Sequence, residues 1–159
     1  MTRIVPLVVV LLMSLVAGAV HGAEWGAIVP GQTTQEAVRA QYGEPSKRAT
    51  KKVDGYDTTE WLYEGTRAPG GVRRLAVDFG LLTPAGYRPE VVRVIRLDLA
   101  PGAFTRPLIE RGWGIPNRVG KEGDTPLFFY DTGLIVLFDR DGWMVQTLVF
   151  TPPQPTAPR

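Results

Sequence analysis

Carboxylates are the main side chains that could do chemistry in this sequence, because most other catalytic residue types are nearly absent. The chain has no cysteine, its one histidine is His21, and its serines are Ser14 and Ser46. This composition excludes Cys–His nucleophile pairs, Ser-His-Asp triads and zinc or iron sites built from His or Cys. We therefore expect no metal ligands and no cofactor.

Three of the carboxylates, Glu60, Glu64 and Asp78, fall in neighbouring strand-like runs. Two carboxylates at a defined separation are enough for glycoside-type acid–base catalysis, so a carboxylate-based hydrolase is one hypothesis. Arg74 lies in the same region, and a surface charge network accounts for the same residues without any reaction. We favour the network, expect no catalytic residue and predict that the protein is not an enzyme.

A basic run, Lys47, Arg48, Lys51 and Lys52, could contact a negatively charged surface. The sequence places it in a loop between a helix and the first strand, where it is either a solvated loop or a contact for anionic lipid headgroups. Each charge near such a surface contributes roughly 1 kcal/mol. Overall the chain has 18 basic and 16 acidic residues, which predicts no nucleic-acid partner.

Residues 1–23 have the pattern of a secretory signal peptide. Arg3 precedes an apolar stretch from Ile4 to Val16, and small residues follow. Cleavage is expected after Ala19 or after Ala23, with Ala23 favoured. We predict an exported protein, periplasmic or associated with the outer membrane, without lipid attachment and without a transmembrane segment after cleavage.

An internal repeat indicates how the mature chain is organised. The segment from Pro30 aligns without a gap with the segment from Pro101, and the two share proline, glycine and threonine at positions that fix local geometry. Each copy predicts a short helix, over residues 34–42 and 105–113, with Thr33 and Thr105 as the caps and Gly43 and Gly114 at the ends.

Three strand-like runs follow each predicted helix, separated by turn signals short enough to require antiparallel hairpins. The runs are Thr58–Glu64, Arg73–Phe79, Val91–Leu99, Leu127–Asp131, Leu134–Phe138 and Trp143–Phe150. The predicted fold class is α+β, a tandem repeat of a helix followed by three antiparallel strands, with two helices packed on one face of a shared antiparallel sheet. The predicted boundaries are 24–99 for the first unit, 100–151 for the second and 152–159 for a proline-rich, disordered tail.

Alternation along the strands of the second unit predicts an apolar outward face. It consists of Leu127, Phe129, Ile135 and Leu137, beside Asp131. An antiparallel sheet with only one buried face should have polar residues on the other, so something must cover these side chains. The cover is internal, from residues 24–26, the tail or a loop, or it is a protein partner or second copy. An error in the predicted strand register is the third explanation.

The motif formed by Pro30, Gly31, Thr33, Val38, Gly43 and Pro45, followed by the aromatic run Trp61-Leu62-Tyr63, resembles the BamE (SmpA/OmlA) family. The fold of that family is shared with the beta-lactamase inhibitory protein, which is a tandem of two helix-plus-sheet units. The resemblance covers roughly residues 28–150 and implies a non-catalytic role, either holding partners in outer-membrane assembly or blocking an enzyme with a concave sheet. The chain lacks the lipid-bearing cysteine that is usual in BamE-type proteins, and it has two units where they usually have one.

These observations together predict a protein-binding or scaffold module of the bacterial cell envelope with a protein partner. The alternative is a secreted enzyme inhibitor that docks through the sheet, and the hydrolase is the less favoured third hypothesis.

Overall fold

The computed structural model describes residues 22–153, which form one antiparallel sheet with two short α-helices. The first half of the chain contains α1 (Gln35–Tyr42), β1 (Lys47–Val53), β2 (Tyr56–Glu64), a 3-10 turn (Gly65–Arg67), β3 (Val72–Thr83) and β4 (Gly86–Leu99). The second half contains α2 (Arg106–Trp113), β5 (Arg118–Glu122), β6 (Thr125–Phe129), β7 (Leu134–Phe138) and β8 (Val145–Phe150).

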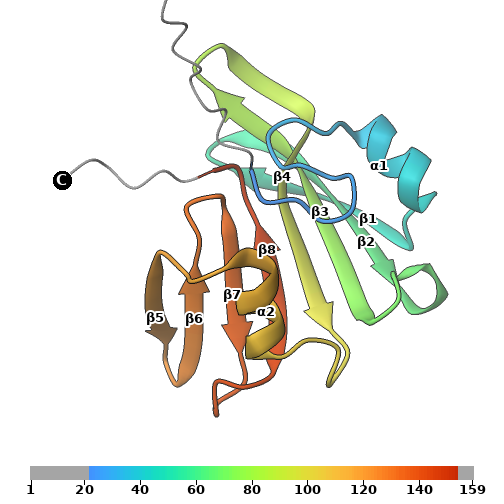
Figure 1. Cartoon of the computed structure of the whole chain (residues 1–159). Helices are drawn as coiled ribbons and strands as arrows, with labels where there is room; N and C mark the ends of the chain where they lie inside the picture. Colours follow the sequence, from blue (N-terminus) through green and yellow to red (C-terminus); the bar gives the residue numbers. More distant parts are fainter. Residues whose placement is uncertain (1–21, 154–159) are drawn as a thin grey trace, which may run out of the picture.

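The eight strands lie in the order β1-β2-β3-β4-β8-β7-β6-β5, and all neighbours are antiparallel (Figure 1). Each half contributes a run of strands linked by hairpins. The halves meet where the fourth strand of one pairs with the fourth strand of the other, from Ile95 opposite Phe150 to Asp98 opposite Thr147. The two edges of the sheet are therefore β1 and β5.

The predicted fold class, a helix-plus-three-strand tandem repeat with two helices packed on the sheet, is wrong. The molecule is dominated by the eight-stranded sheet, and four strands, not three, follow each helix. Each helix has only eight residues and one buried side chain, Val38 in α1 and Ile109 in α2. Helices this short supply little cover, so the sheet and the irregular segments form most of the core.

The core lies on one side of the sheet, where the strands present large apolar residues in alternation. Trp61, Tyr63, Leu75, Val77, Phe79, Ile95, Leu97, Val136, Phe138, Leu148 and Phe150 have at most 2% of their surface exposed. The segment before α1 completes this core. Ile28 is fully buried, and the ring of Trp25 lies 6.3 Å from those of Phe104 and Phe150.

Each helix is fixed at its end by a tyrosine from the sheet. The Tyr63 hydroxyl donates to the carbonyl oxygen of Gly43, and the Tyr130 hydroxyl donates to that of Gly114, both at 3.0 Å. At the start of α1 the cap is Thr34, not Thr33 as predicted, because the Thr34 hydroxyl accepts from the backbone of the first turn.

Two strands were missed from the sequence, and both are edges. The basic run at 47–52 was expected in a loop, but it forms most of β1, and β5 was not predicted at all. Every residue of β1 from Lys47 to Lys52 is exposed, so this strand has no apolar alternation to reveal it.

The predicted signal peptide lies outside the described residues except for Gly22 and Ala23. Ala23 is buried, and its backbone N–H donates to the carbonyl oxygen of Thr132 at 2.8 Å. Of the two expected cleavage positions, only Ala19 keeps this residue in the mature chain. Residues 154–159 of the predicted tail also lie outside the described range. Neither α1 nor α2, the α-helices found within 22–153, is long and apolar enough to cross a membrane.

Candidate functional site

The side of the sheet opposite the core, here called the open face, carries the residues that alternate with the buried ones. Cross-strand partners connect it in an unbroken row from β5 to β1. In order, the row consists of Arg118, Phe129, Ile135, Val149, Arg96, Ala76, Leu62 and Lys47. Val38 and Ile109, the buried residues of the two helices, belong to the core cluster on the other side.

The predicted outward residues of the second half lie together on this face. Leu127 is directly opposite Leu137, and Phe129 is directly opposite Ile135. Val149 of β8 extends the group, because it is opposite Ile135 on the next strand. We call these five residues the apolar patch. Apart from Leu127, which is buried, its members are partly exposed, so three adjoining strands present a contiguous apolar surface.

Residues 24–26 do not cover the apolar patch. Trp25 packs against Phe104 and Phe150, which belong to the core side, and the neighbouring Ile28 is also part of the core cluster. At one end of the patch lies a hollow of about 230 Å³, lined by Arg118, Phe129, Tyr130, Gly133, Ile135 and Thr151. The patch therefore has both an apolar surface and a recess at its edge.

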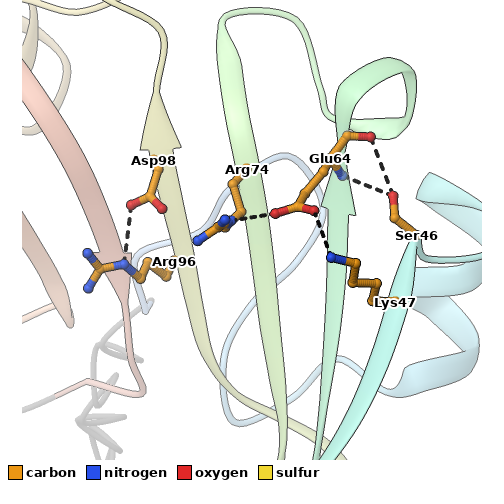
Figure 2. A network of polar contacts seen from close by, with 6 residues as sticks. All are labelled: Ser46, Lys47, Glu64, Arg74, Arg96 and Asp98. Carbon is orange, nitrogen blue, oxygen red and sulfur yellow. Dashed lines mark hydrogen bonds and ion pairs between the residues drawn. The ribbon is translucent and has the colours of Figure 1, made fainter.

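The other half of the open face carries paired charges, which Figure 2 shows side by side across β1 to β4. Glu64 bonds Arg74 at 2.7 Å and lies 3.9 Å from the Lys47 amine, and its backbone N–H donates to the Ser46 hydroxyl. On β4, Asp98 accepts from Arg96 at 3.2 Å. We call Lys47, Glu64, Arg74, Arg96 and Asp98 the charge ladder.

The charge ladder adjoins the apolar patch at the centre of the sheet. Asp98 also accepts a hydrogen bond from the Thr147 hydroxyl of β8 at 3.2 Å, and Arg96 is opposite Val149 of the patch. A hollow of about 250 Å³ lined by Glu64, Arg73, Arg74 and Asp98 lies along the ladder. A ligand on this face would thus meet an apolar half and a half of balanced charge.

The carboxylates considered for catalysis are only partly brought together. Glu60 and Asp78 are directly opposite on β2 and β3, whereas Glu64 belongs to the charge ladder. Burial raises the pKa of Asp78, Arg93 opposes that rise and Glu60 adds to it. Glu60 bonds Lys51 at 2.6 Å and Asp78 lies 3.8 Å from Arg93, and neither carboxylate lines the hollows described above. Of the three carboxylates, only Glu64 bonds Arg74, the cation that the sequence placed in the charge network.

The four basic residues proposed to contact an anionic surface are divided between the two sides of β1. Lys47 and Lys51 pair with Glu64 and Glu60 of the open face. Arg48 pairs with Glu44 and lies over the ring of Trp61 on the core side. Lys52 pairs with Asp57 at 2.9 Å. Because all four are already paired, the structure does not collect them into one positive surface.

Within residues 22–153, no cluster of three or more His, Cys, Asp or Glu side chains is arranged to hold a metal ion. Sequence reasoning also missed Val149 and the β4 side of the charge ladder. Val149 lies opposite Ile135 through the β7–β8 hairpin, and Asp98 lies opposite Arg74 through the β3–β4 hairpin. The contact between the patch and the ladder depends on the pairing of β4 with β8, two strands about 50 positions apart in the chain, for which no local signal exists.

Comparison with known proteins adds a fold and no function. No family model and no curated protein matches the chain. Among solved structures, the chain is similar to a DUF4309 family protein (YjgB) from Bacillus subtilis, with 18% sequence identity and a TM-score of 0.51. The alignment covers 80% of this chain and 83% of that protein. At this identity the similarity shows that the general fold is shared.

Proposed function

We propose that this protein is a non-catalytic binding module that holds a protein partner on its open face. The observation that carries the proposal is the apolar patch, gathered from β6, β7 and β8 on a side of the sheet that the helices and residues 24–26 leave uncovered. Contiguous apolar surface of this kind is typical of interaction sites.

The surroundings of the patch support a protein as the ligand. Protein interfaces combine an apolar centre with a polar rim, and the charge ladder supplies such a rim on the β4 side. Its charges are paired within the chain, so a partner can approach without leaving several isolated charges buried. The hollow beside Phe129 and Ile135 can take one apolar side chain as an anchor.

The expected location of this module is the cell envelope. The support is the signal-peptide pattern of residues 1–23 and the resemblance of the Pro30–Pro45 motif to the BamE family, whose members hold envelope proteins. A secreted inhibitor would use the same face on an enzyme, so the two hypotheses differ in the partner and not in the site.

The test is affinity capture from detergent-solubilised envelopes with wild-type protein and an Ile135→Lys, Leu137→Lys variant. Both residues lie at the centre of the patch, and lysine there places a charge where the partner must be apolar. We expect wild type to retain a partner that the variant loses. The comparison uses equal amounts of the two proteins, after circular dichroism has confirmed that both are folded.

A matched control introduces two lysines in place of apolar residues outside the open face. Leu108→Lys, Ile115→Lys changes two apolar residues that are already 44% and 91% exposed and do not belong to the open face. This control should capture the partner as wild type does. Capture that survives in the patch variant, or is lost equally in the control, would rule out the open face as the site.

A further inference from the structure

The two edges of the sheet differ in how their charges are satisfied. On β1, all four cations pair with carboxylates of the same chain: Glu44, Asp57, Glu60 and Glu64. On β5, the ion pairs formed within residues 22–153 include none of the charged residues Arg118, Lys121 and Glu122. Val119 between them is 66% exposed, although it is an apolar residue of a strand.

An unpaired edge strand is a template for another strand, and proteins usually protect it with charge. The five residues of β5, Arg-Val-Gly-Lys-Glu, have a charge pattern that complements itself when the strand is reversed. In an antiparallel pair centred on Gly120, Arg118 lies opposite Glu122 of the second strand, and this contact occurs twice. Val119 then lies opposite Lys121, whose aliphatic stem can cover it.

We propose that two copies of this protein associate through β5, antiparallel and centred on Gly120, to form one continuous sheet of sixteen strands. The second copy is the occupant that the charges favour, because opposite charges directly across an antiparallel pair are stabilising. Such a contact is isologous, with the same strand used by both molecules around a two-fold axis.

Side-chain placement at the seam agrees with this pairing. Arg118, Gly120 and Glu122 alternate onto the open face, since their partners on β6 are Phe129, Leu127 and Thr125. Gly120 has no side chain, and the ring of Phe129 lies 3.1 Å from the point where a Cβ would be. The two-fold axis keeps both open faces on the same side, so the apolar patches of the two copies become neighbours across the seam.

The other edge is less suited to pairing with itself. When β1 is paired with itself about Thr50, Arg48 lies opposite Lys52 and Ala49 opposite Lys51, which places like charges next to each other at both ends. The charge patterns of the two edges therefore favour a dimer with a β1 edge at each end over a longer assembly. This inference does not depend on the proposed partner of the open face.

The test measures the dimer dissociation constant by sedimentation equilibrium. It uses the protein without its signal peptide, together with charge variants of β5. Wild type is expected to dimerise, and Glu122→Arg to raise the dissociation constant roughly tenfold or more, because each seam contact then joins two cations. The double variant Arg118→Glu, Glu122→Arg restores the opposite charges and should restore the dimer. Both residues are exposed, so the variants should remain folded.

Two further measurements fix the site and the register. Val119→Cys protein mixed with Lys121→Cys protein should form a disulfide-linked dimer in a chain that otherwise has no cysteine, because the two positions are opposite in this register. The Ile135→Lys, Leu137→Lys variant should still dimerise. A wild-type monomer, a dimer insensitive to Glu122→Arg, or a dimer lost only with the patch variant would each overturn the proposal.

Discussion

Two tyrosines show how single residues join the helices to the sheet. Tyr63 and Tyr130 each donate a hydrogen bond to the glycine carbonyl at the end of a helix, and those glycines, Gly43 and Gly114, have φ angles of 72° and 81°. Burial raises the pKa of both tyrosines, and for Tyr63 it does so to about 12, with Glu44 adding to the rise and Arg39 opposing it.

The raised pKa of Tyr63 predicts a loss of stability in alkaline solution. Its neutral form is favoured in the folded state, so its contribution is complete below the ordinary pKa of 10.0 and is lost as the pH rises towards about 12. Tyr63→Phe keeps the ring but loses the bond to Gly43, which should cost about 1 kcal/mol at neutral pH. Above pH 10 its stability should fall less steeply than that of wild type.

Urea denaturation at a series of pH values, followed by circular dichroism, measures this difference. The unfolding free energies of wild type and Tyr63→Phe should converge as the pH rises. The pH dependence that remains in Tyr63→Phe is expected from Tyr42 and Tyr130, whose pKa values burial also raises. Two curves that stay parallel through this range would show that Tyr63 is not the responsible group.

At the scale of elements, the sequence predicted strands where one side chain in two is buried. The run Leu134–Phe138 is apolar throughout, and the structure has a strand with those same bounds in which buried and partly exposed residues alternate. The edge strands β1 and β5 were missed because an exposed edge needs no apolar alternation. The number of strands in each half was wrong for the same reason.

The candidate site was predictable to a similar extent. Alternation alone placed Leu127, Phe129, Ile135 and Leu137 on one face, and the cross-strand register brings them together. The fifth member, Val149, follows from the β7–β8 hairpin, whereas the position of the patch beside the charge ladder depends on β8 also lying beside β4, which no local pattern indicates. Of the charge ladder, the sequence indicated Glu64 and Arg74, whereas Lys47 was assigned to a loop and Arg96 and Asp98 of β4 were not considered.

The turn between β6 and β7 depends on one glycine. Gly133 has a φ of 100°, and a Cβ there would collide with the backbone of Thr151, while the Gly133 carbonyl accepts from the Thr151 N–H. Gly133→Ala should therefore destabilise the protein by about 3 kcal/mol or more, from backbone strain and overpacking together.

Gly123, in the turn between β5 and β6, is the matched control. It also has a positive φ, of 58°, but a Cβ there would meet nothing within 4 Å. Gly123→Ala should cost only about 1 kcal/mol, from backbone strain alone. Equal losses for the two variants in thermal denaturation would show that the contact with Thr151 contributes nothing.

For the whole molecule, the pairing of β4 with β8 decides whether the halves unfold separately. Leu148 and Leu97 are opposite across that junction, and both are fully buried in a core cluster that contains residues of both halves. Since the junction is made within a shared core, we expect one cooperative unfolding transition for the chain.

Leu148→Ala tests this expectation. The cavity that it leaves should cost about 2–5 kcal/mol, and both halves should lose stability together although the change lies in β8. Native-state hydrogen exchange measures the protection of amides in β2 and in β7, and so reports the stability of each half separately. Protection that falls in β7 and stays unchanged in β2 would mean that the halves are independent.

The central place of β8 also determines when the chain can fold. During synthesis β1 to β4 emerge first. Until β8 arrives, the edge of β4 that includes Ile95 and Leu97 has no partner strand. From the completion of β4 until β8 arrives, the polypeptide therefore exposes a strand edge of the kind that aggregates. A chain that stops before Val145 lacks the strand on which both halves depend, so β8 must be synthesised before a native molecule can exist.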